Sequence, residues 1–321
     1  MVALDTVKQS NSNLKSYGPG LVGVFVGGTS GIGESTARSF VRHATNPRVY
    51  LIGRNEAQAL KISQDMREIK AHTKVEFVKC DVSLLKRVDE ACEVIREKEE
   101  RVNVLVLSSG IFTTRGRDET EEGLDKKLSL HYYSRMRFIS NLLPQLNAAA
   151  ASPTGEGKGL ASVVSVLEAG GEGPLNLADL PLKNNYTLRN AAKHAITMTS
   201  LSMEVLAREN TSVSFIHSYP GIVKTGVMRD MGVIGRTLMN ALFVIAKPLT
   251  VPLEESGERH LFAAAGVPKN AAGGEGAGKP YLVSWNGEPR GNESVLSEYR
   301  EKKTGETVWE HTVDVFQSIC G

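Results

Sequence analysis

Six short apolar runs separated by amphipathic stretches are the feature that most constrains the fold of this 321-residue chain. Valine, isoleucine and leucine dominate the runs, which are near-continuously apolar and do not alternate strictly with polar residues. Near-continuous hydrophobicity over so few residues indicates strands covered on both faces, as in a parallel sheet. The expected strands are Leu21–Val26, Arg48–Ile52, Val75–Val78, Val104–Leu107, Ser162–Val166 and Val213–His217.

Helical patterns between these runs supply the crossovers that parallel strands need, so we predict an α/β fold with a Rossmann-type, doubly wound parallel sheet. The length and composition suit a single domain, residues 21–290, after an N-terminal extension, 1–20, and before a helical tail, 291–321. Stretches rich in Ala, Gly, Ser or Pro at Ala148–Gly159 and Ala264–Gly278 predict surface loops.

Residues 226–252 carry a cluster of long apolar side chains. This segment could cover a hydrophobic substrate or simply pack against the sheet, as apolar helical stripes usually do. Both interpretations stay open at this point.

The charge balance and the cysteines exclude several classes of protein. Lys and Arg number 38 against 36 Asp and Glu, so no basic field points to nucleic acid. Cys80, Cys92 and Cys320 are scattered and lack metal-site or disulfide spacing, which indicates a reducing, cytoplasmic setting without a bound metal. No run reaches the roughly 18 apolar residues of a membrane span.

A glycine-rich turn follows the first expected strand and precedes a helical pattern over Glu34–Arg42. Glycines there allow a tight turn, let backbone N–H groups approach a pyrophosphate, and let the helix pack closely on the strand. The helix N-terminus adds partial positive charge. The turn therefore predicts a dinucleotide site that includes Gly27, Thr29, Ser30, Gly31, Ile32 and Gly33.

Arg54 follows the second expected strand, where a carboxylate would hold the ribose hydroxyls of NAD. A guanidinium there can pair with a 2′-phosphate, which favours NADP(H). The alternative is an arginine that faces solvent at a strand end.

With these residues in place, the chain resembles the short-chain dehydrogenase/reductase family, of the retinol-dehydrogenase-like or fungal type, from about Leu21 to Val283. The glycine motif matches, with Val26 in place of a threonine. The resemblance implies a pair of residues that contacts adenine, a cofactor-binding stretch in place of the family's Asn-Asn-Ala-Gly, and a loop on the nicotinamide side. The residues that carry these likenesses are Asp81 and Val82, then Ser108, Ser109 and Gly110, and then Pro220, Gly221, Val223 and Thr225.

The resemblance also implies a catalytic group of Asn, Ser, Tyr and Lys, from which this chain departs. Tyr186 stands at the place of the tyrosine that passes a proton to the substrate. Asn190 stands at the place of the lysine that lowers the pKa of this tyrosine and holds the nicotinamide ribose. An amide can hydrogen-bond a ribose but has no charge with which to stabilise a phenolate. Lys193 is seven positions after Tyr186, about 10.5 Å along a helix axis, and is a poor substitute.

The two other catalytic places are also altered. His131 stands at the place of the asparagine. Its imidazole could relay a proton, or it could be a helix histidine whose ring is hydrogen-bonded by the backbone. Leu167 or Glu168 stands at the place of the catalytic serine, and the nearest hydroxyl in the sequence is that of Ser165.

The stretch Ala169–Asn185 resembles the insertion of retinol-dehydrogenase-like members, at the mouth of the substrate site. Glu168 and Glu172 could be functional carboxylates there, although charges in glycine-rich loops are mostly solvated.

These residues support three functions. We favour an NADP(H)-dependent oxidoreductase acting on a hydrophobic carbonyl or alcohol, such as a secondary metabolite in a biosynthetic pathway, with Tyr186, His131, Asn190 and Glu168 as catalytic candidates. A non-redox isomerase or cyclase on the same scaffold is the alternative, since the lysine and serine are missing. A cofactor-binding protein without catalysis is the third. The expected partner is a small molecule, and assembly into a homo-oligomer is left open.

Overall fold

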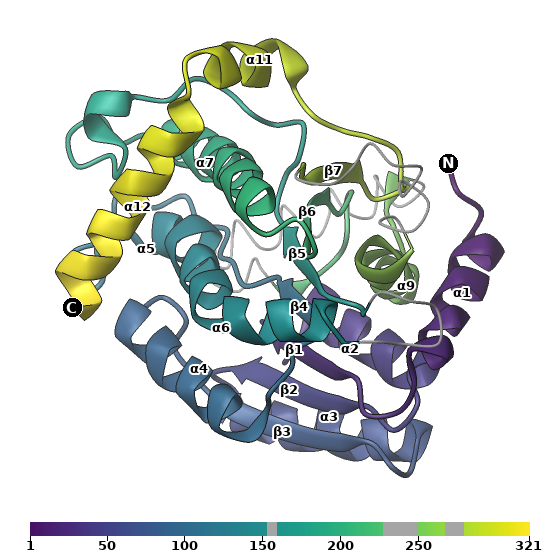
Figure 1. Cartoon of the computed structure of the whole chain (residues 1–321). Coiled ribbons are helices and arrows are strands. Elements are labelled where there is room, and N and C mark those ends of the chain that lie inside the picture. Colours follow the sequence, from purple (N-terminus) through teal and green to yellow (C-terminus); the bar gives the residue numbers. More distant parts are fainter. Residues whose placement is uncertain (153–158, 227–248, 267–278) are drawn as a thin grey trace.

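The computed structural model of the chain describes residues 1–152, 159–226, 249–266 and 279–321 (Figure 1). Its centre is a seven-stranded sheet in the order β3-β2-β1-β4-β5-β6-β7, and every neighbouring pair is parallel. This confirms the doubly wound α/β fold predicted from the apolar runs. The strands are β1 (Val22–Val26), β2 (Arg48–Gly53), β3 (Lys74–Lys79), β4 (Val104–Leu107), β5 (Ser162–Val166), β6 (Ser214–Tyr219) and β7 (Tyr281–Ser284).

The six expected strands are all present, and β4 and β5 have the expected bounds. Strand β7 was not expected from the sequence. It lies at the edge of the sheet and is only partly buried, and its apolar residues, Tyr281–Val283, form a run too short to indicate a strand by itself.

Helices cover both faces of the sheet (Figure 1). Helices α4, α6 and α7 share one apolar core with residues such as Val24, whereas α2, α3 and α9 share another with residues such as Phe25. Neighbouring residues of one strand thus enter different cores, which explains why polar residues do not alternate with apolar ones. These helices are α2 (Gly31–His43), α3 (Glu56–Ile69), α4 (Leu85–Lys98), α6 (Ser134–Ala150), α7 (Leu188–Glu209) and α9 (Leu253–Ala265).

Both ends of the chain are helical and pack against the central domain. Helix α1 (Leu4–Ser12) lies on α9, where Asn11 Nδ2 donates a hydrogen bond to the buried Glu258 carboxylate at 2.8 Å. At the other end, α11 (Glu293–Glu301) leads into α12 (Thr304–Cys320), which packs against α7 and α4 (Figure 1).

The two expected loops begin inside helices. Residues 148–150 end α6, and residues 264 and 265 end α9. Most of the expected substrate-covering segment, residues 227–248, lies outside the described residues, as do 153–158 and 267–278.

Within the described ranges, no helix is both long and apolar enough to cross a membrane. The three cysteines are free thiols. The same ranges contain no cluster of His, Cys, Asp or Glu that could hold a metal ion.

Candidate active site

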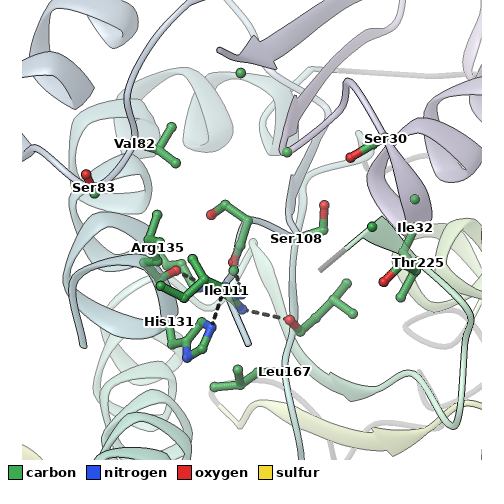
Figure 2. A pocket seen from close by; sticks show the side chains of 18 of the residues that line it. Ser30, Ile32, Val82, Ser83, Ser108, Ile111, His131, Arg135, Leu167 and Thr225 are labelled. Carbon is green, nitrogen blue, oxygen red and sulfur yellow. Dashed lines mark hydrogen bonds between the residues drawn. The ribbon is translucent and has the colours of Figure 1, made fainter. Parts of the chain in front are cut away.

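A cleft of about 750 Å³ opens at the carboxyl ends of the parallel strands (Figure 2). The loops after β1 to β6 all contribute to its walls. The cleft spans the point between β1 and β4 where the strand order reverses, the usual ligand site of an open α/β sheet.

Most of the residues expected to bind the cofactor line this cleft, because parallel strands bring the loops at their carboxyl ends to one edge. His131 lines it as well. The expected cofactor residues in the lining are Gly27, Thr29, Ser30, Gly31, Ile32, Arg54, Asp81, Val82, Ser109, Gly110, Pro220, Gly221, Val223 and Thr225.

The glycine turn has a geometry that other residues could not adopt. Gly27 has φ of 81°, and a Cβ there would lie 2.9 Å from the backbone nitrogen of Ser109. Gly33 lies behind the cleft lining, where a Cβ would meet the Ser108 hydroxyl and approach the Gly27 carbonyl to 2.7 Å. Helix α2 begins at Gly31, so its first N–H groups border the cleft. This close-packed turn fits the pyrophosphate of a dinucleotide.

The exposed side chain of Arg54 lies at the far end of the cleft, after β2. Its guanidinium is therefore available to a ligand. The position is the one at which the second strand of this fold meets the adenosine ribose.

His131 lies in a single π-helical turn, Ser129–Tyr133, and its ring is held by a backbone group. The N–H of Ile111 donates to His131 Nε2 at 3.2 Å, so the neutral imidazole carries its proton on Nδ1. Burial, followed by the charges of Arg135 and Lys127, lowers the pKa of His131 to about 3. At neutral pH the ring is therefore uncharged and has an Nδ1–H to donate, but it is not an imidazolium acid.

The phenol of Tyr186 is paired with a lysine that the sequence did not suggest. Lys127 Nζ donates to Tyr186 Oη at 2.9 Å, and Lys127 itself is buried. Burial and the Asp125 carboxylate nevertheless raise the pKa of Tyr186. Tyr186 is not among the residues that line the cleft, although Lys126 and Arg115 beside this pair are.

Asn190 and Lys193 also lie outside the cleft lining. The Asn190 side chain donates to the Asn185 carbonyl at 3.0 Å, and its backbone N–H is capped by Thr187. Lys193 Nζ donates to the Gly171 carbonyl at 2.6 Å. Both side chains hold the loop before and beside α7.

Leu167, and not Glu168, lines the cleft at the end of β5. Glu168 is exposed, whereas the hydroxyl of Ser165 is buried and accepts from Arg135 Nη1 at 2.8 Å. The expectation of solvated carboxylates is wrong for Glu172, which is 2% exposed and accepts from Ser200 Oγ at 2.8 Å.

Arg135 also lines the cleft, and sequence reasoning missed it. The available signal was its place four residues after His131, which puts the two side chains on one face of a helix. In Figure 2 both lie with Ile111 at one end of the pocket, across from Ser30 and Ile32 of the glycine turn. Burial lowers the pKa of Arg135 to about 9, so the group remains charged at neutral pH.

A parallel sheet with a glycine-lined cleft over its switch point defines a protein with a Rossmann-type fold. A model of the short chain dehydrogenase family matches residues 22–232. The chain belongs to this family.

Fungal proteins are similar to this chain over nearly their whole length. Oxidoreductase AN1596 of Emericella nidulans is 42% identical over 334 residues, which cover 97% of each protein. Oxidoreductase andH of Emericella variicolor is 37% identical, and the match covers 100% of this chain and 98% of andH.

Solved structures share the fold at low sequence identity. The NADPH-bound carbonyl reductase from chicken fatty liver superposes with a TM-score of 0.57 at 18% identity, covering 85% of this chain and 99% of that one. L-Sorbose reductase from Gluconobacter frateurii, complexed with NADPH and L-sorbose, has a TM-score of 0.57 at 19% identity, covering 86% of this chain and 98% of that one.

Proposed function

We propose that this protein is an NADP(H)-dependent oxidoreductase that acts on a carbonyl or alcohol of a hydrophobic small molecule, such as a secondary metabolite. The observation that carries the proposal is the single cleft that joins the glycine turn and Arg54 to an end lined by Ile111, Leu130 and Leu167. Apolar side chains beside a dinucleotide site suit the hydrophobic part of a substrate, and the polar His131 in the same lining suits its oxygen. The fungal relatives named as oxidoreductases support the same class of reaction.

Each part of the cleft has a role in holding the cofactor. The N–H groups at the start of α2 would bind the pyrophosphate, and Arg54 would pair with the 2′-phosphate. Asp81 and Val82 would border the adenine, and the loop from Pro220 to Thr225 the nicotinamide. The bound cofactor supplies the hydride.

Among the catalytic candidates, only His131 lines the cleft, so we assign it the contact with the substrate oxygen through Nδ1–H. Tyr186 keeps the role of proton donor in this proposal, with Lys127 in place of a lysine at position 190 as the cation beside its hydroxyl. Asn190 and Glu168 would shape the mouth of the site.

We also infer a retinol-dehydrogenase-like subtype from the long stretch between Glu168 and Tyr186, and a cytoplasmic location from the three free cysteines. A biosynthetic role agrees with the hydrophobic substrate. Size-exclusion chromatography would give the oligomeric state.

The test is incubation with C4-deuterated NADPH and a panel of aromatic and long-chain aliphatic ketones and aldehydes. We expect one NADPH oxidised per alcohol formed, with deuterium at the carbinol carbon, and severe loss of turnover in His131→Ala and Tyr186→Phe. Unlabelled product at constant NADPH concentration would refute net reduction and favour an isomerase or cyclase. Full turnover in both variants would refute the catalytic assignment alone.

A further inference from the structure

Arg135 is a buried cation without a carboxylate partner among the described residues. Its side chain is 1% exposed, and its guanidinium donates only to neutral oxygens. The acceptors are the carbonyls of Leu130 at 3.1 Å, Val166 at 2.8 Å and Ser109 at 2.6 Å, and the hydroxyl of Ser165 at 2.8 Å. Because it is costly to remove a charge from water, a buried charge without an ionic partner calls for a further interaction.

One N–H of this guanidinium has no acceptor within the described part of the chain. A guanidinium has five N–H donors. Nε uses its one and Nη1 both of its two, but Nη2 uses only the one directed at the Ser109 carbonyl. Arg135 lines the cleft, so a ligand bound there would be the acceptor that this remaining donor lacks.

The hydroxyl of Ser109 is the second unpartnered group at this place. Its Oγ is buried and has no hydrogen-bond partner, although the residue lines the cleft. A buried hydroxyl without a hydrogen-bond partner destabilises the protein, and a ligand that bonds to it would remove this cost. The carbonyl of the same residue accepts from Arg135 Nη2, so the two free groups are neighbours.

This pair lies toward the reactive end of the cleft. Ser109 follows β4 and Val166 ends β5, on the opposite side of the glycine turn from Arg54 and β2. A cofactor with its adenosine at Arg54 and its pyrophosphate at α2 would bring its other ribose to β4 and β5.

The number of free donors indicates the kind of ligand. A carboxylate would require two parallel N–H donors for bidentate binding, and Arg135 has one left. Two neighbouring hydroxyls each accept and donate a hydrogen bond, which suits one guanidinium N–H beside one serine hydroxyl.

We propose that Arg135 and Ser109 form a subsite for the ribose hydroxyls of the nicotinamide half of the cofactor. The inference rests on the proposed function, because it requires NADP(H) in the cleft. The resemblance assigns this ribose to a lysine of α7, whereas here Asn190 and Lys193 bond to loop carbonyls instead. The cation that binds this ribose is thus Arg135 of α6, which acts as a binding and positioning residue.

Calorimetry with two ligands tests the subsite. NADPH contains the nicotinamide ribose, whereas adenosine 2′,5′-bisphosphate keeps the adenosine and the 2′-phosphate without it. We expect Ser109→Ala to weaken NADPH binding about 3- to 10-fold, the worth of one net hydrogen bond, and to leave bisphosphate binding unchanged. Arg135→Lys should weaken NADPH binding more strongly than Ser109→Ala does. An unchanged affinity of this variant for the bisphosphate would show that its fold is retained.

Arg54→Ala is the matched control, since it should weaken both ligands alike. Equal losses for both ligands in Ser109→Ala, or no loss for either, would overturn the subsite while leaving the proposed cofactor in place. If the parent protein bound neither ligand, the proposed function and the subsite would both be wrong.

Discussion

Gly33 lies where a helix packs so closely on a strand that only the hydrogen side chain of glycine fits. A Cβ at this position would meet Ser108 Oγ and approach the Gly27 carbonyl to 2.7 Å, and neither the backbone nor the short serine can move away easily. We therefore expect Gly33→Ala to lower the free energy of unfolding by about 1–3 kcal/mol, as overpacking does. It should also weaken NADPH binding at least tenfold. Urea denaturation and calorimetry measure the two effects.

Gly116→Ala is the control for this prediction. Gly116 is exposed, and nothing lies within 4 Å of a Cβ built there. The free energy of unfolding of Gly116→Ala should stay within about 0.5 kcal/mol of that of the parent protein. If Gly33→Ala behaved in the same way, the close approach of α2 to the turn would not matter for binding.

Arg54 is the residue on which cofactor preference depends in our proposal. Its guanidinium is exposed at the adenosine end of the cleft. Arg54→Asp should erase or reverse a preference for NADPH over NADH, because a carboxylate repels a 2′-phosphate and accepts from a ribose hydroxyl. Calorimetry with both cofactors measures which of them binds more tightly. Equal affinities in the parent protein would contradict the assignment.

At the scale of elements, a buried hydrogen-bond network joins the loop after β5 to α7, β6 and the segment before α11. Ser200 Oγ donates to Glu172 Oε1 at 2.8 Å, and the N–H of Asn292 donates to Oε2 at 3.0 Å. Ser200 also contacts His217 Nδ1 at 2.8 Å, and His217 Nε2 accepts from the N–H of Glu168 at 3.3 Å. These bonds are consistent when neutral His217 carries its proton on Nδ1.

This network predicts that substitutions of two glutamates of one loop affect the free energy of unfolding to different extents. In Glu172→Gln an amide replaces a carboxylate that accepts from two sides, so one donor loses its partner. We expect a loss of about 1–3 kcal/mol in the free energy of unfolding. Glu168→Gln is the control, because that side chain is exposed and should change stability by less than about 0.5 kcal/mol. Urea denaturation that ranked the two variants the other way would contradict the network.

At the scale of the whole molecule, three histidines are kept neutral by burial. Burial lowers the pKa of His131 and of His217 to about 3 and that of His260 to about 4. In the unfolded chain these rings take up protons below about pH 6.5. The unfolded state therefore binds more protons between about pH 6.5 and 4, and the free energy of unfolding must fall as the pH falls through that range.

His131→Asn tests this linkage at the cleft. Between pH 5.5 and 4.5 each such histidine should contribute about 1.4 kcal/mol per pH unit to the slope of stability against pH. The variant should show a slope shallower than that of the parent by about this amount, measured by urea denaturation at several pH values. Replacement of the exposed His72 by asparagine should leave the slope unchanged. An unchanged slope in His131→Asn would mean that the ring is charged in the folded protein.

The sequence by itself determined six of the seven strands of the sheet and most of the cleft. Val104–Leu107 is apolar throughout, and in Ser162–Val166 only two serines interrupt the valines. Such short, near-continuous apolar runs are a local property that a chain expresses wherever both faces of a strand are buried. Residues directly after those strands, such as Ser109 and Leu167, then meet at one edge because all strands of a parallel sheet point the same way. The cleft could therefore be placed before any contact was known.

Only the tertiary structure decided which charged groups meet there. Lys127 and Tyr186 are 59 positions apart, and Arg135 reaches Ser165 from 30 positions away. Helical and strand periodicities describe which residues share a face of one element, but not how far a side chain extends between elements or which carbonyl it meets. The burial of Glu172 likewise depends on Asn292, which the chain brings back from 120 positions further on. Packing between distant segments creates these low-dielectric surroundings, and the protonation and pairing of each charged group follow from them.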